Sequence, residues 1–279
     1  MDSTEHFQYL LDRGREEGWE GVAQELRVAL ESAPGDPTLL CWLGMVEREM
    51  GVPGGGYDLF KDALAQGAED PLVLAIIGNG LAQLDDPDAE AALRSAAVMA
   101  PDLLLARTLF GAYLSREGLH EEAMRELDAA WALDSRDPFV AYERGVALAL
   151  QGRMVEALEA LARAVELESG EGWSLVMKGL VEVELDRMDD AARNLSEGAR
   201  DRPEDVEAQV MAALAAAAVR REDLAWEMLE RGRQNAGALD LPFLEQVEAR
   251  LGEGPESARS FLVRELLPGV MRERLMTRP

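Results

Sequence analysis

The sequence has 279 residues but only one cysteine, two histidines and two lysines, and aromatic side chains make up 5% of it. Cys41 is alone, so an intrachain disulfide is excluded. The longest apolar run, residues 210–219, is far shorter than the roughly 18 residues that a membrane-spanning helix needs. The N-terminus shows neither the basic nor the apolar region of a secretory signal. We therefore expect a cytoplasmic protein.

Positive charge is also scarce. The chain carries 54 acidic and 28 basic residues, a formal net charge of −26. A surface this acidic repels phosphate backbones, which argues against nucleic acid as a partner and favours a basic or apolar one. Residues 255–279 are the exception, since five arginines and three glutamates give them a charge of +2. The preference for arginine over lysine, with abundant alanine and glycine, suggests a bacterial genome rich in GC.

What the sequence does contain is an internal repeat. Small residues recur at spacings of 34, 33, 34, 34 and 34 residues, at Gly44, Gly78, Gly111, Gly145, Gly179 and Ala213. Two further ladders with a spacing of 34 residues are Ala89, Ala123, Ala157, Ala191 and Ala225, and Leu93, Leu127, Leu161, Leu195 and Leu229. Three ladders that share one period indicate a chain of similar structural units.

Each repeat is predicted to contain two helices. In one of them the sequence predicts helices from Pro138 to Leu150 and from Met154 to Leu167, separated by a turn at Gly152. Asp137 is a suitable N-cap, and proline is tolerated in the first turn of a helix. The glycine and alanine ladders would let the two helices of a unit approach closely.

These features resemble the tetratricopeptide repeat (TPR) family, whose units are helix–turn–helix hairpins with this period and these small and apolar positions. The resemblance implies an all-α fold, a right-handed α-solenoid. It would have about seven hairpins over residues 1–239 and a degenerate C-terminal helical cap over 240–279 in the same domain. The first units depart from the pattern, with Leu10 and Gly56 at ladder positions, and are expected to be less regular.

The sequence offers little for catalysis. His6 and His120 lie in different units, and without a cysteine cluster no metal site is expected. The glycine-rich stretch 51–56 has no preceding strand and no following Gly-Lys-Ser/Thr, so we interpret it as a turn rather than a phosphate loop. The acidic stretch 85–90 lacks the glycine and the final glutamate of a calcium loop. We predict no enzyme, no cofactor and no metal.

The resemblance implies that the first helix of each unit lines a concave groove. From the fourth unit onward this groove is mostly apolar with scattered glutamates, and methionines would make it adaptable. The predicted protein-binding residues are Phe139, Tyr142, Glu143, Val146, Trp173, Val176, Met177, Leu180, Glu184, Glu207, Val210, Met211 and Leu214. Lys178 is expected to pair with Glu182 one turn later.

So much exposed apolar surface would be unusual for a monomer, so something should cover it. Three alternatives are open: a segment of a partner protein; the chain's own C-terminal stretch, residues 261–276, or a second copy of the chain; or a superhelix tight enough to make these positions core. The preferred function is a non-catalytic protein-binding module, an adaptor, scaffold or chaperone, that holds an apolar or basic amphipathic segment. A structural homo-oligomer or a regulatory subunit of another enzyme is the alternative.

Overall fold

Aspartate–proline steps begin many of the helices in this computed structural model, which describes residues 3–52, 54–167 and 172–277. Asp36, Asp70 and Asp137 each accept hydrogen bonds from backbone N–H groups of the following first turn, where a proline stands at the first helical position. Such a cap satisfies donors that otherwise have no partner, and proline loses nothing there. The predicted Asp137 cap is thus present.

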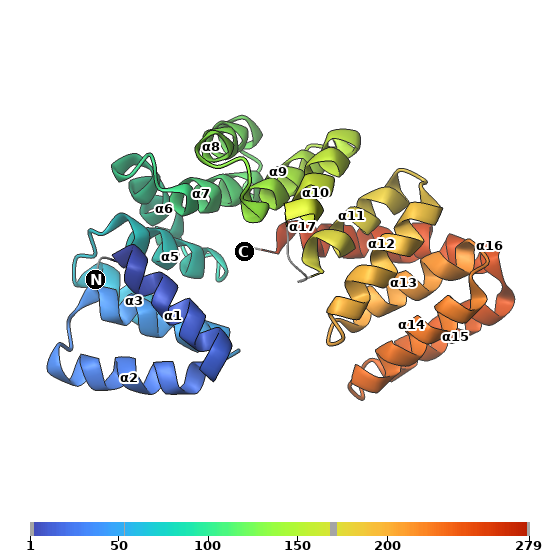
Figure 1. Cartoon of the computed structure of the whole chain (residues 1–279), viewed down its shortest axis with the longest axis horizontal. Helices are drawn as coiled ribbons and strands as arrows, with labels where there is room; N and C mark the ends of the chain where they lie inside the picture. The colour runs from blue at the N-terminus through green and yellow to red at the C-terminus, as the bar shows by residue number, and fades with distance from the viewer. Residues whose placement is uncertain (1–2, 53, 168–171, 278–279) are drawn as a thin grey trace. The chain divides into compact units, whose positions relative to one another are not determined.

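The described residues divide into two compact units, one from the N-terminus to residue 134 and one from residue 135 to 277. In the first unit the helices are α1 (Ser3–Glu17), α2 (Trp19–Ser32), α3 (Pro37–Glu49), α4 (Tyr57–Ala65), α5 (Pro71–Ala82), α6 (Asp88–Met99), α7 (Leu104–Arg116) and α8 (His120–Leu133). Consecutive helices pack as hairpins, α3 with α4, α5 with α6 and α7 with α8 (Figure 1).

The second unit continues the pattern and then leaves it. Its hairpins are made by α9 (Pro138–Leu150) with α10 (Met154–Leu167), α11 (Trp173–Glu184) with α12 (Met188–Asp201), and α13 (Val206–Ala218) with α14 (Glu222–Asn235). They are followed by α15 (Leu241–Glu253), α16 (Pro255–Ser260), the π-helical turn η1 (Phe261–Leu266) and α17 (Leu267–Met276). The predicted all-α fold of repeated hairpins is confirmed, whereas a single domain over residues 1–239 stays a prediction.

The glycine and leucine ladders meet inside each hairpin. A β-carbon added at Gly111 would lie 2.7 Å from Leu127 Cγ, and one at Gly145 would lie 2.6 Å from Leu161 Cγ. Real β-carbons do not approach that closely, so glycine is required where the two helices of a hairpin are nearest. The repeated spacing in the sequence is therefore the footprint of one repeated steric contact.

The first unit is irregular, as expected. Its α4 has only 9 residues, against 14 in α8, and it is preceded by the N-cap residue Gly56, whose φ is +82°. A β-carbon at Gly56 would lie 2.2 Å from the carbonyl oxygen of Gly44. Glycine therefore stands in the alanine ladder because neither the backbone conformation nor the space admits a side chain. Pro53 of the same turn lies outside the described residues, as do residues 278–279 of the predicted cap.

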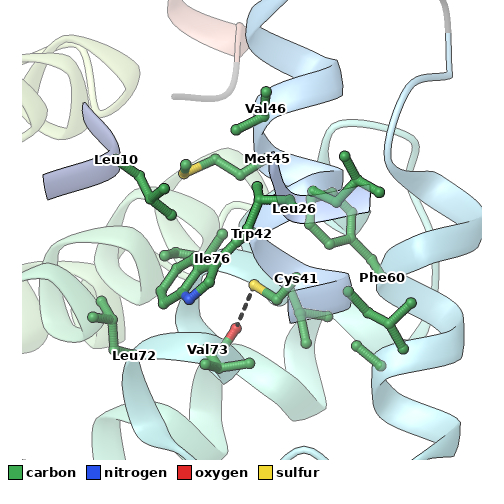
Figure 2. Close-up of a cluster of buried hydrophobic side chains, with 14 of the residues drawn as sticks. Leu10, Leu26, Cys41, Trp42, Met45, Val46, Phe60, Leu72, Val73 and Ile76 are labelled. Atoms are coloured by element: carbon green, nitrogen blue, oxygen red, sulfur yellow. Dashed lines mark hydrogen bonds between the residues drawn. The ribbon is translucent and has the colours of Figure 1, made fainter. Parts of the chain in front are cut away.

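The core of the first unit is a cluster of buried apolar side chains from α1 to α6 (Figure 2). Trp42 of α3 is fully buried, and Phe7 of α1 stacks on it with ring centroids 5.6 Å apart. Ser3 Oγ donates a hydrogen bond to Asp70 Oδ2, 2.7 Å away, which ties the start of α1 to the cap of α5. Cys41 Sγ lies 3.6 Å from the carbonyl oxygen of Val73 in the same cluster.

Candidate functional site

The predicted groove residues lie mainly on one face, formed by the first helices of the second unit, α9, α11 and α13. We call it the inner face. The predicted residues that are buried on these helices are Glu143, Val146, Val176, Met177, Leu180, Val210, Met211 and Leu214. The second helices α10, α12 and α14 pack against these first helices and account for part of this burial; the side chain of Val176, for example, lies against Gly198 of α12.

The C-terminal segment, residues 255–277, also packs on these helices. Its α16 and η1 contact α13, and its α17 contacts α11 and α9 (Figure 1). The buried side chains of this segment are Ala258, Phe261, Leu262, Leu267, Val270, Met271 and Leu275. Those in α17 are spaced as one helical stripe, while Arg272 and Glu273 face solvent. Of the three alternatives that the sequence left open, the chain's own C-terminal stretch does contact these helices, and their packing against α10, α12 and α14 also makes part of this surface core.

The segment is one helical stretch broken by a change of register. Pro268 has no N–H group to donate to the preceding turn, and its ring clashes with the carbonyl four residues earlier in a regular α-helix. The π-helical turn η1 lies directly before α17 and accommodates this proline. Such turns carry one extra residue and are common at functional sites. The widened turn lets Phe261 and Leu262 stay buried together with the stripe of α17.

One arginine of the segment anchors it to the inner face. Arg274 makes two hydrogen bonds to Asp205, with donor–acceptor distances of 3.0 and 2.8 Å, and one of 2.9 Å to Glu207. The side chains of Arg274 and Asp205 are only 14% and 12% exposed. A bidentate arginine–carboxylate pair is among the stronger polar contacts because its geometry is fixed and charge-assisted. Asp205 also accepts from the N–H of Ala208 as the N-cap of α13.

The two carboxylates respond differently to this arginine. Burial is the largest single effect on the pKa of Asp205 and acts to raise it, but the hydrogen bonds and charge of Arg274, the N–H of Ala208 and the charge of Arg202 together hold that pKa below its ordinary value. For Glu207 burial is the larger effect, and its pKa lies above the ordinary value despite Arg274. The charge of Glu273 also acts to raise it. Asp205 is thus the better-matched partner of Arg274, and Glu207 is imperfectly compensated.

A second arginine of the segment makes a weaker contact. Arg259 of α16 pairs with Asp186 just beyond α11, but the two side chains are 44% and 70% exposed. Exposed ion pairs of this kind contribute little because water and salt screen them. Arg259 therefore serves as an internal comparison for Arg274.

The remaining predicted residues are less covered. Phe139, Tyr142 and Glu207 are half-buried, and Glu184 is exposed. Trp173 is 45% exposed at the start of α11, and the guanidinium carbon of Arg202 lies 3.3 Å from its ring centroid. Arg202 Nε in turn lies 3.7 Å from Asp205. The tryptophan is therefore an accessible neighbour of the Asp205–Arg274 pair rather than part of the buried stripe.

The predicted pair of Lys178 and Glu182 is present, with Lys178 Nζ 3.1 Å from the Glu182 carboxylate. Asn194 of α12 also donates to Glu182, at 2.6 Å. Glu182 is buried and satisfied within the hairpin of α11 and α12. These groups hold two helices together and play no visible part in the inner face.

Sequence reasoning missed Asp205, Arg274 and Arg202 as individual site residues. The positive charge of residues 255–279 pointed to the segment but not to one arginine. From the sequence, Asp205 is expected to be a helix cap, which it also is. Arg202 contacts Trp173 only because α11 and α12 pack against each other. No local sequence signal identifies such contacts.

Within the described part of the chain, no group of three or more His, Cys, Asp or Glu could hold a metal ion. Nor does any helix of the described residues have both the length and the apolar character to cross a membrane. What the inner face presents is an apolar surface with an acidic pair at one end, which is suited to a helix that carries an arginine.

Several solved structures have a similar arrangement of helices. A chain of the APC/C hetero-tetramer Cut9–Hcn1 aligns with a TM-score of 0.67 at 16% identity, over 85% of this chain and 48% of that one, so this chain spans about half of its length. A thermophilic TPR protein of Thermus thermophilus, TTC0263, aligns with a TM-score of 0.57 at 21% identity, over 64% and 98% of the two chains. PilW, a type IV pilus biogenesis factor, aligns with a TM-score of 0.57 at 17% identity, over 72% and 94%.

No protein-family model and no curated protein matches the sequence. The likenesses to solved structures are below 25% identity and therefore concern the fold. TPR proteins are typically protein–protein interaction modules. The three ladders, the consecutive hairpins and these structural likenesses agree with one another, and the chain is a protein of the tetratricopeptide-repeat fold.

Proposed function

We propose that this chain is a non-catalytic protein-interaction module, an adaptor or chaperone, whose inner face binds an apolar or amphipathic segment of another protein. The observation that carries the proposal is that this face already holds such a segment. The C-terminal segment buries an apolar stripe on α9, α11 and α13 and places Arg274 between Asp205 and Glu207. A surface that seats one amphipathic helix has the shape and polarity to seat another.

The strong negative charge supports the same function. A net charge of −26 raises the encounter rate with basic partners and disfavours acidic ones. The acidic pair at the start of α13 then gives the bound helix a fixed register, because only one position of the ligand can place a cation there. Apolar contacts would supply most of the affinity and this pair much of the selectivity.

The two half-exposed tryptophans of the second unit allow a matched test. Trp173 is 45% exposed beside the inner face, and Trp226 is 42% exposed on α14, a second helix of its hairpin. Each is replaced in turn by a photoreactive phenylalanine analogue, and the protein is irradiated in the cells that produce it. We expect discrete protein adducts at position 173 that are absent at position 226.

Adducts of the same proteins at both positions would mean that the inner face is not the binding surface. An absence of adducts at position 173, with the protein folded and expressed, would also contradict the proposal. Circular dichroism of both variants gives the control for folding.

A further inference from the structure

The C-terminal segment is packed as a ligand and not as another repeat. Each of α9, α11 and α13 pairs with the helix that follows it; α16 packs on α15 but more extensively on α13, and η1 and α17 contact the first helices α13, α11 and α9. The segment is helical throughout, has one apolar face, and makes its anchoring ion pair through a single arginine. These are the properties expected of a helix bound in a groove.

The joint before the segment suits a change of position. Gly254, between α15 and α16, has a φ of +106°, and a β-carbon added there would meet no atom within 4 Å. Pro255 follows it and starts α16. A glycine with open space around it can change its backbone angles without steric cost, so the segment can leave the inner face once the contacts of α16 and Phe261 with α15 also break.

The match between the segment and the inner face is incomplete. Asp205 and Glu207 together carry two negative charges; Arg274 supplies one positive charge between them, and Arg202 adds a second one beside Asp205 but not beside Glu207. The neighbouring Glu273 adds a further negative charge that acts against that of Glu207. A helix that kept the arginine but had a neutral or basic residue in place of Glu273 would fit the acidic pair better.

We propose that the C-terminal segment is an internal ligand of the inner face, which a basic amphipathic helix of a partner protein displaces. This inference rests on the proposed function and names the chemistry of the partner. The displacing helix carries a stripe of large apolar residues and an arginine that takes the place of Arg274. It carries no acid at the position of Glu273. Until such a partner arrives, the segment keeps the apolar stripe out of water.

Tethering sets how strong the partner must be. A covalently attached segment with a short joint competes at an effective concentration of the order of millimolar. A partner helix identical to the segment would therefore bind weakly, and one improved at the acidic pair would bind better. Only a partner helix with an arginine in place of Arg274 and no acid in place of Glu273 would displace the segment. The segment would therefore select among partners as well as cover the inner face.

The full-length protein can be tested directly with synthetic peptides. Met276, at the end of α17, is 43% exposed and is replaced by cysteine to carry an environment-sensitive fluorophore, while the buried Cys41 stays unlabelled. The probes are peptides of residues 255–277 with the native sequence or with one change: Glu273→Lys, Arg274→Glu or Arg259→Ala. Displacement of the labelled segment is followed by fluorescence, and circular dichroism reports that the protein stays folded.

We expect the native peptide to displace the segment and the Glu273→Lys peptide to do so at a concentration about two- to fivefold lower. The Arg274→Glu peptide should need at least about tenfold more than the native one. The Arg259→Ala peptide is the matched control and should stay within about twofold of it. Equal midpoints for all four peptides, or no displacement at millimolar concentration, would overturn the proposal.

A second experiment changes the segment in the full-length protein instead of in the peptide. A full-length Arg274→Glu protein should bind the labelled native peptide at least about tenfold more tightly than the wild type, and an Arg259→Ala protein should match the wild type. Equal binding by all three proteins would contradict the proposal. A concentration-dependent dimer of the Arg274→Glu protein in light scattering would also overturn it, by showing that a second copy supplies the helix.

The two proposals fail separately. If the peptides behave as expected but no adduct forms at position 173 in cells, the segment is exchangeable and the protein-binding role is wrong. If adducts form at position 173 but the peptides do not displace the segment, the protein binds partners and the internal-ligand proposal is wrong.

Discussion

Gly179 of α11 lies so close to α12 that a β-carbon on it would be 2.6 Å from Cγ of Leu195. The same contact recurs between Gly145 and Leu161 in the preceding hairpin. The distance between the two helices of a hairpin is therefore set by a glycine on one and a leucine on the other. This is a property of the fold, and it can be separated from the binding face by mutation.

Substitution of Gly179 by alanine should destabilise the protein. Forcing a methyl group into a packed contact costs about 1–3 kcal/mol, and the better helix propensity of alanine returns about 1 kcal/mol. We expect a net loss of up to about 2 kcal/mol in the free energy of unfolding, measured by urea denaturation. Gly252→Ala is the control, because a β-carbon there meets nothing within 4 Å. The idea fails if the two variants are equally stable.

The buried carboxylate of Glu182 should make Lys178 costly to remove. Lys178→Met would leave Glu182, whose side chain is 4% exposed, without its cation. Unpaired buried charges are expensive, and we expect a loss of about 2–3 kcal/mol at neutral pH. Glu182→Gln should cost about 1 kcal/mol or less, since its side-chain oxygen can still accept from Asn194. The double variant should recover most of the loss caused by Lys178→Met; no recovery would count against this account.

The acidic pair should show two opposite pH dependences. The pKa of Asp205 is lowered, so its contribution to stability is present above its ordinary value of 3.8 and is lost as the pH falls through its lowered folded value. Asp205→Asn keeps the cap of α13 and should cost about 1–2 kcal/mol at pH 7. The difference from wild type should shrink below about pH 4.

Glu207 should behave in the opposite sense. Its pKa is raised, so its contribution is fully present below its ordinary value of 4.5 and is lost as the pH rises through its folded value. The wild type should therefore lose stability relative to Glu207→Gln between about pH 4 and pH 7, by up to about 1 kcal/mol. Urea denaturation of wild type and variant across this range measures the difference. If the wild type instead gains stability relative to Glu207→Gln as the pH rises, Arg274 outweighs burial at Glu207.

Cys41 should be inert in the folded protein. It is completely buried, and burial raises the pKa of its thiol well above the ordinary value. Thiol reagents attack the thiolate, so at pH 8 the native protein should react only as fast as it unfolds. In denaturant the same cysteine should react as quickly as a free thiol. Rapid reaction of the native protein at pH 8 would mean that the first unit opens far more readily than its packing suggests.

The hairpins could be predicted from the sequence because their determinants are local. The helices expected from Pro138 to Leu150 and from Met154 to Leu167 are α9 and α10 of the structure with the same bounds. Caps, first-turn prolines and turn glycines all act within a few residues. The ladder residues act within one hairpin, so their spacing survives in the linear sequence.

The site was predictable only in outline. The helices of the groove could be named from the repeat, and eight of the thirteen predicted residues are buried, but their role in binding stays a prediction. The position of the C-terminal segment depends on contacts between Arg274 and Asp205, which are 69 residues apart. Trp173 was expected in the groove, yet its ring is 45% exposed and lies against Arg202, at the end of the second helix of the same hairpin. Such long-range contacts leave no periodic trace.

The π-helical turn η1 fixes the rotational phase of the C-terminal segment. Each residue of an α-helix advances the side chains by about 100°, so the extra residue that a π-helical turn carries sets the angle at which α17 meets α11 and α9. Deletion of one residue from η1 would restore a regular helix and rotate Arg274 by about a quarter of a turn, away from Asp205. One residue of length thus decides whether the arginine and the apolar stripe engage the inner face together.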